Sequence, residues 1–180
     1  NYPYLIEVFK KLPANVQLDI YGAGPLHDEL QQEIEKNKLN IKLCGVREDI
    51  HNVLRQYDAF IMSSVFEGQP IALLEAMASG MPAILSDIPV LREVTNNKAI
   101  YYSLNNGDDL VQKIHALLNG QINLDEFAQS NFDRAKRIAD KENYMNTLHR
   151  LYLKPEIYRV KHPSISLVKV LLPGISAKAS

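Results

Sequence analysis

Two glutamates have a spacing that would place both carboxylates beside one bound ligand. Glu67 lies in a polar loop after an apolar run, and Glu75 lies on the second turn of a helix expected over residues 70–79. Carboxylate oxygens accept hydrogen bonds from the neighbouring hydroxyls of a sugar or ribose, but they repel phosphate. The free N–H groups of the first helical turn, with the helix dipole, attract an anion such as a diphosphate. Together these features predict a site for a polyol joined to phosphate, the outline of a nucleotide sugar.

Each glutamate also has a plainer interpretation. Glu67 could serve only to balance the helix dipole, and Glu75 could lie on an ordinary exposed helix face. The apolar residues around Glu75 leave it few polar neighbours, which favours the ligand interpretation for the pair. In the same stretch, Gly68 would let a ligand approach the backbone closely, and Pro70 is expected to be the first residue of the helix.

A second glycine-containing loop, Gly22-Ala23-Gly24-Pro25, follows an alternating apolar segment over residues 16–21. It matches the first half of the G-x-G-x-x-G fingerprint of dinucleotide-binding domains. The third position of that fingerprint is His27 here, so we do not expect NAD to bind.

Strands and helices are expected to alternate along most of the chain. Alternating and continuous apolar runs predict strands over residues 16–21, 41–44, 59–62, 82–85 and 100–102, with amphipathic segments between them. Such alternation predicts an α/β, Rossmann-like parallel sheet with right-handed crossovers and helices on both faces. Residues 125–153 are expected to form a helical C-terminal stretch, and the periodicity fades after Pro155.

Composition excludes several classes of protein. The 180 residues carry a net charge of -1, which argues against a nucleic-acid partner, and the single Cys44 excludes an internal disulfide. The five histidines show no metal-ligand spacing, and neither a signal peptide nor a membrane-spanning segment is recognisable, so a cytoplasmic protein is expected. The segment from Ser130 onward contains ten Lys and Arg residues and four acidic residues, a net charge of +6. This is interpreted either as a solvated helix face or as contact with an anionic membrane surface.

The stretch E-G-Q-P-I-A-L-L-E-A-M-A-S-G-M-P, which begins at Glu67, resembles the signature of family 4 retaining glycosyltransferases of the GT-B fold. The resemblance runs from about residue 1 to residue 153. It includes residues 22–25, 45–47 and 57–59 and the pair Ser86-Asp87 followed by Glu93, and the order of these elements makes the match specific.

The resemblance implies the donor-binding half of a hexosyltransferase that retains the anomeric configuration and needs neither a cofactor nor a bound metal. Glu67 would contact the hydroxyls of the donor sugar as the catalytic residue, and Glu75 would bind the ribose. Backbone amides around residues 68–71 would hold the sugar and diphosphate, with Val46 and Arg47 beside the base. The implied donor site comprises Gly22, Gly24, Val46, Arg47, Glu67, Gly68, Gln69, Pro70, Ile71 and Glu75.

The same resemblance implies the domain organisation of the chain, its partner domain and its cellular setting. Residues 1–153 would form the nucleotide-sugar-binding domain and residues 154–180 a tail that crosses back toward an N-terminal acceptor-binding half. That half, and the family's phosphate-binding Arg and Lys, do not match any part of this chain, so we expect weak nucleotide binding and no transfer by it alone. The expected setting is polysaccharide, lipopolysaccharide or glycolipid assembly at the inner face of the cell membrane. A non-catalytic nucleotide-sugar-binding or scaffolding relative and a GT-B sugar-nucleotide epimerase are the alternatives.

Overall fold

The computed structural model describes residues 1–138, in which strands and helices alternate as the sequence predicts. The strands are β1 (Leu18–Tyr21), β2 (Ile41–Gly45), β3 (Phe60–Met62), β4 (Ala83–Ser86) and β5 (Ile100–Tyr102). The helices are α1 (Tyr2–Phe9), α2 (His27–Asn37), α3 (Ile50–Leu54), α4 (Ile71–Ala78), α5 (Pro89–Thr95), α6 (Asp109–Leu118) and α7 (Leu124–Ile138).

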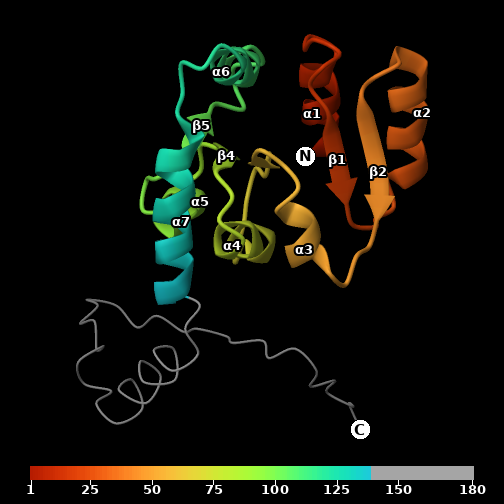
Figure 1. Ribbon diagram of the computed structural model, residues 1–180. Coiled ribbons are helices and arrows are strands. Elements are labelled where there is room, and N and C mark those ends of the chain that lie inside the picture. Colours follow the sequence, from red (N-terminus) through yellow and green to blue (C-terminus); the bar gives the residue numbers. More distant parts are fainter. Residues whose placement is uncertain (139–180) are drawn as a thin grey trace, which may run out of the picture. The chain divides into compact units, whose positions relative to one another are not determined.

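All the strand pairs are parallel, which confirms the predicted sheet type, but the strands form two sections rather than one continuous sheet. In the first section β1 pairs with β2, with Leu18 opposite Ile41. In the second, β4 lies between β3 and β5, with Ala83 opposite Phe60 and Ile84 opposite Ile100. Figure 1 shows the two sections as separate groups of strands.

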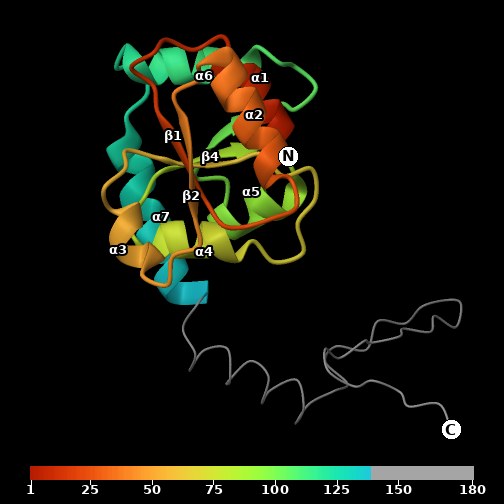
Figure 2. The same ribbon diagram turned by 90° about the vertical axis from the view of Figure 1, so that its right-hand side faces the viewer.

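Helices cover both faces of the section formed by β3, β4 and β5, because side chains on a strand point alternately to its two faces. Ile84 packs into a core cluster with residues of α1 and α6. Its neighbours Ala83 and Leu85 pack into a second cluster with residues of α4 and α5. Helix α7 contributes Ala135 to the second cluster and lies alongside α4 (Figure 2). The predicted two-sided, doubly wound arrangement is confirmed for this section.

Helix α1 connects the cores of the two sections. Its buried residues Leu5, Ile6, Val8 and Phe9 belong to the same cluster as Leu18 of β1 and residues of β2, β4 and β5. Burial of this apolar surface is the main favourable term in folding, at roughly 25 cal/mol per Å². The two sections are therefore held together by packing under α1 rather than by strand pairing.

The start of α4 differs from the expectation by one residue. Pro70 is the N-cap rather than the first helical residue, because its ψ of 76° is not helical, and α4 begins at Ile71. The Pro70 carbonyl accepts the first helical hydrogen bond, from the Leu74 N–H at 3.1 Å. The ring of Pro70 is buried, so this residue anchors the preceding loop as well as the helix.

The predicted helix continues as α7 to Ile138. Its expected extension to residue 153, the tail 154–180 and most of the basic segment lie outside the described residues. Among residues 1–138, no helix is long and apolar enough to cross a membrane.

Candidate functional site

The loop after β3, residues 63–70, is held in place by hydroxyl groups. The Ser63 Oγ donates to the carbonyl of Asn1 at 3.1 Å, and the fully buried Ser86 at the end of β4 donates to the carbonyl of Ser64 at 2.6 Å. The Ser64 Oγ in turn donates to the Glu67 Oε1 at 2.6 Å. The carboxylate of Glu67 is thus oriented by a residue that is itself fixed to the ends of two strands.

Glu67 and Glu75 line the same cavity, which has a volume of about 740 Å³. Ser63 and Ser64 from the loop and Ala72 from the first turn of α4 line it as well. The site therefore lies at the carboxyl end of β3, the place where open α/β sheets bind ligands. Both glutamates are therefore among the residues that line this cavity, which also reaches side chains of α1 and α6, and Glu75 itself is exposed. That the two carboxylates face one bound ligand stays a prediction.

The start of α4 adds hydrogen-bond donors to this end of the cavity. The Ile71 N–H donates to the carbonyl of Gln69 at 2.9 Å. Within the described residues, the N–H groups of Ala72 and Leu73 have no backbone acceptor. Two free amides at the positive end of the helix dipole can hold an anionic group.

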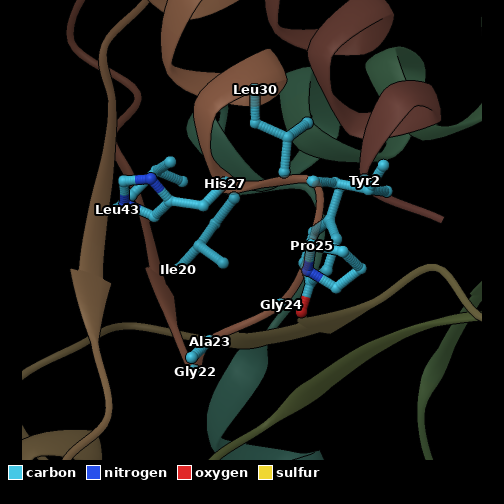
Figure 3. Close-up of a pocket in the computed structure, with 10 residues that line it drawn as sticks. Tyr2, Ile20, Gly22, Ala23, Gly24, Pro25, His27, Leu30 and Leu43 are labelled. Atoms are coloured by element: carbon cyan, nitrogen blue, oxygen red, sulfur yellow. The ribbon is translucent and has the colours of Figure 1, made fainter.

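The glycine loop after β1 lines a second, smaller cavity of about 140 Å³ (Figure 3). Gly22 and Gly24 border it together with apolar side chains of α2, β1 and β2. Gly22 has a φ of +132°, a conformation that side-chain-bearing residues rarely adopt, and its N–H donates to the carbonyl of Gly45 at 2.8 Å. Tyr2 and Ile20 line both cavities, so the two spaces share part of their walls.

Several predicted site residues line neither of these two cavities. Val46 is 72 % exposed, and the Arg47 guanidinium is already bound to the Asp49 carboxylate through N···O distances of 2.8 and 2.9 Å. The other members of this group belong to the loop and the helix start: Gly68, Gln69, Pro70 and Ile71. Their assignment to the donor site stays a prediction, as do the individual roles of Glu67 and Glu75.

Sequence reasoning missed three residues that the structure places at the site. The only sequence signal for Ser64 was its position three residues before Glu67, close enough for the two side chains to meet in a loop. Tyr57 was noted only within the matching element 57–59, without a role at the site, and Tyr2 carries no local signal. Each reaches the larger cavity from a different part of the chain. Among residues 1–138, no group of three or more His, Cys, Asp or Glu side chains is placed to hold a metal ion.

Parallel strands with helices on both faces define the class of doubly wound α/β domains. The two glutamates and the free amides follow the end of β3, where such domains bind their ligands. The family model described as "Glycosyl transferases group 1" matches residues 1–151. The chain belongs to this family, and the predicted resemblance to group 1 glycosyltransferases of the GT-B fold is confirmed.

Curated relatives match part of the chain. EpsF of Bacillus subtilis is 37% identical over 92 residues, which are 48% of this chain and 24% of EpsF. A protein of Escherichia coli, named UDP-Gal:alpha-D-GlcNAc-diphosphoundecaprenol alpha-1,3-galactosyltransferase, is 39% identical over 72 residues, 38% of this chain and 19% of that protein. The matched part is thus about a quarter or less of the length of these relatives.

Solved structures match a larger share of the chain. A mutant of TarM from Staphylococcus aureus, in complex with fondaparinux, alpha-GlcNAc-glycerol and UDP, superposes with a TM-score of 0.75 at 25% identity. The superposition covers 84% of this chain and 32% of that structure's chain. This likeness confirms the predicted α/β fold.

Proposed function

We propose that this chain is the donor-binding part of a glycosyltransferase and that its substrate is a nucleoside diphosphate sugar. The observation that carries the proposal is that Glu67 and Glu75 line one cavity together with Ala72, whose N–H is one of the free amides of α4. Carboxylates suit the hydroxyls of such a donor, and the helix start suits its diphosphate. UDP in the TarM complex and UDP-Gal in the name of the Escherichia coli relative support this donor class.

Each group has a distinct task in this proposal. The family resemblance, not the geometry, separates the two glutamates: Glu67, oriented by Ser64, would accept hydrogen bonds from the donor sugar hydroxyls, and Glu75 from the ribose. The amides of Ala72 and Leu73 face the diphosphate and stabilise the negative charge that grows on it as the sugar leaves. Transfer with retention of the anomeric configuration is proposed from the resemblance to the family signature alone. Transfer without a metal ion is supported by the helix dipole of α4, which would take over the stabilisation of the leaving diphosphate.

The wider setting is also part of the proposal. An acceptor-binding half completes the cleft in the intact enzyme, and the product belongs to a polysaccharide, lipopolysaccharide or glycolipid. The lipid-linked acceptor named for the Escherichia coli relative supports assembly at a membrane. A cytoplasmic protein held at the inner membrane face by its basic C-terminal segment would meet such an acceptor.

The test is Glu75→Ala in the full-length enzyme, assayed for sugar transfer from UDP-, GDP- and ADP-sugars. Removing an acceptor that bonds two hydroxyls should lower kcat/KM about a hundredfold or more. Glu126→Ala, an exposed glutamate on α7, is the matched control and should leave transfer unchanged.

Full transfer activity in the Glu75→Ala enzyme would contradict the assignment of this residue. A wild-type enzyme that isomerises the nucleotide sugar without transferring it, or that binds it without turnover, would contradict the transferase itself. The anomeric configuration of the product and activity after metal chelation test the retaining and metal-independent parts of the proposal separately.

A further inference from the structure

A chain of side-chain hydrogen bonds lies outside the groups used above. The Tyr57 hydroxyl donates to the Asp19 Oδ2 at 2.6 Å, and the hydroxyls of Tyr21 and Tyr57 are 2.8 Å apart. The Gln17 Nε2 donates to the other carboxylate oxygen of Asp19 at 2.7 Å. The rings of Tyr21 and Tyr57 meet edge to face, with centroids 6.2 Å apart and planes at 77°. All four side chains belong to residues that line the larger cavity.

This network joins the two sections of the sheet. Asp19 and Tyr21 belong to β1 in the first section, whereas Tyr57 lies between α3 and β3 of the second. In the part of the chain that the structure describes, no strand pairing connects these sections. The bonds of Tyr57 therefore link them at the cavity wall, a role that strand pairing plays elsewhere in the sheet.

Tyr21 and Tyr57 each lie just before a segment of the candidate donor site in the sequence. Tyr21 is followed by Gly22 and the glycine loop, and Tyr57 is followed by β3, which leads into Ser64 and Glu67. A shift of one section relative to the other would change the distance between the glycine loop and the two carboxylates. A ligand that contacts both parts would then bind less well.

At neutral pH the Tyr57 phenol is protonated and the Asp19 carboxyl is ionised, which suits the hydrogen bond between them. Burial raises the pKa of Tyr57, and its bonds to Asp19 and Tyr21 raise it further, so the phenol keeps its proton. Burial also acts to raise the pKa of Asp19, but the hydrogen bonds from Gln17, Tyr57 and Cys44, together with the positive charge of Lys42, outweigh it and lower the pKa. The central bond thus runs from a neutral phenol to a carboxylate, and such charge-assisted bonds are short and strong.

We propose that Tyr57 is a positioning residue for donor binding. Through Asp19 and Tyr21 it sets the placement of the glycine loop relative to the loop and helix that carry Glu67 and Glu75. This inference rests on the proposed function, because the ligand that senses the placement is the nucleotide sugar. The fold itself does not depend on the Tyr57 hydroxyl, since the packing under α1 also holds the two sections together.

The experiment compares Tyr57→Phe with Tyr101→Phe in this chain by amide-resolved NMR. Both variants lose a tyrosine hydroxyl that bonds another side chain, but Tyr101 bonds Thr95 within the second section and lines neither cavity. In Tyr57→Phe the amide resonances of Gly22 and Gly24 should shift, although these residues are more than thirty positions away in sequence. In Tyr101→Phe they should not.

Affinity and kinetics provide readouts that a merely structural role would leave unchanged. UDP, titrated into the chain, should bind about five- to tenfold more weakly to Tyr57→Phe than to wild type or Tyr101→Phe, the range of a modest coupling between sites. In the full-length enzyme the donor KM should rise by the same factor while kcat changes by less than about twofold. Adding Asp19→Asn to Tyr57→Phe should cause little further loss, because both changes act on the same bond: one removes its donor and the other the charge of its acceptor.

Unchanged Gly22 and Gly24 resonances in Tyr57→Phe would overturn the proposal. Equal UDP affinity, or a loss confined to kcat, would overturn it as well. Absence of UDP binding by wild type is a different result: it counts against the nucleotide in the proposed function. The resonances of the two glycines then still decide whether Tyr57 couples the sections.

Discussion

Hydrogen bonds from neighbouring side chains orient several carboxylates of this domain. Ser64 orients Glu67, Arg47 is engaged by Asp49, and Tyr57 with Gln17 holds Asp19. A carboxylate with such partners has a fixed direction. The candidate site therefore contains one oriented carboxylate, Glu67, and one exposed carboxylate, Glu75, which is available for a ligand to order.

The network around Asp19 makes the stability of the domain depend on pH. Its pKa is lower in the folded chain than the ordinary value of about 3.9. The stabilisation is therefore complete above that ordinary value and is lost as the pH falls through it toward the lower folded pKa. Urea unfolding of wild type should show this loss as the pH is lowered from about 5 through the ordinary pKa of an aspartate.

Asp19→Asn should flatten the slope of this pH profile, and Tyr57→Phe, which removes one of the two donors, should flatten it in part. A residual slope is expected from Asp87, whose pKa the Arg92 guanidinium lowers. Identical profiles for wild type and Asp19→Asn would contradict the charge state assigned to the network.

At the scale of elements, the turn from β1 into α2 requires glycine at one position and tolerates other residues at the next. Gly22 has a φ of +132°, whereas Gly24 lies outside that region, and an added Cβ would meet no atom within 4 Å at either position. Gly22→Ala should therefore lower the free energy of unfolding by about 1–3 kcal/mol, the cost of strained backbone. Gly24→Ala is the matched control and should change it by less than about 1 kcal/mol.

Chemical denaturation of the two variants measures this difference. Gly22→Ala should also weaken UDP binding, since the loop lines the wall next to the candidate site. Equal stability of the two alanine variants would show that the loop adopts another backbone conformation.

The sequence predicted the elements well and their assembly less well. Every strand and helix expected before residue 138 is present, because apolar periodicity and glycine or proline at the ends are local properties. The division into two sections was not predicted, since it depends on pairing between distant segments. Pro70 lies one residue outside its helix, because local rules do not fix a helix boundary to a single position.

For the candidate site, the sequence indicated the two glutamates but not the side-chain bonds around them. Glu67 and Glu75 line one cavity, which agrees with their spacing around a helix start, but their joint contact with one ligand stays a prediction. The pairing of Arg47 with Asp49 was missed although the two are close in sequence, because an exposed arginine has many alternative partners. The bond between Asp19 and Tyr57 spans 38 positions, and no local pattern carries such information.

At the scale of the whole molecule, the described residues form two sheet sections joined by a shared core and by the bonds of Tyr57. The candidate site draws one wall from each section, because β1 and β3 both line the larger cavity. Nucleotide binding should consequently stabilise the domain, since the ligand would contact both sections in the folded state alone.

The most direct test of the central claim is an NMR titration of this chain with UDP, GDP and ADP, carried to millimolar concentration. We predict that one of the three shifts the amide resonances of Ala72, Glu75, Gly22 and Gly24, and that Glu75→Ala weakens the response while Glu126→Ala does not. If none of the three moves these resonances in the folded chain, or if Glu75→Ala responds as wild type does, the account of the donor site is contradicted.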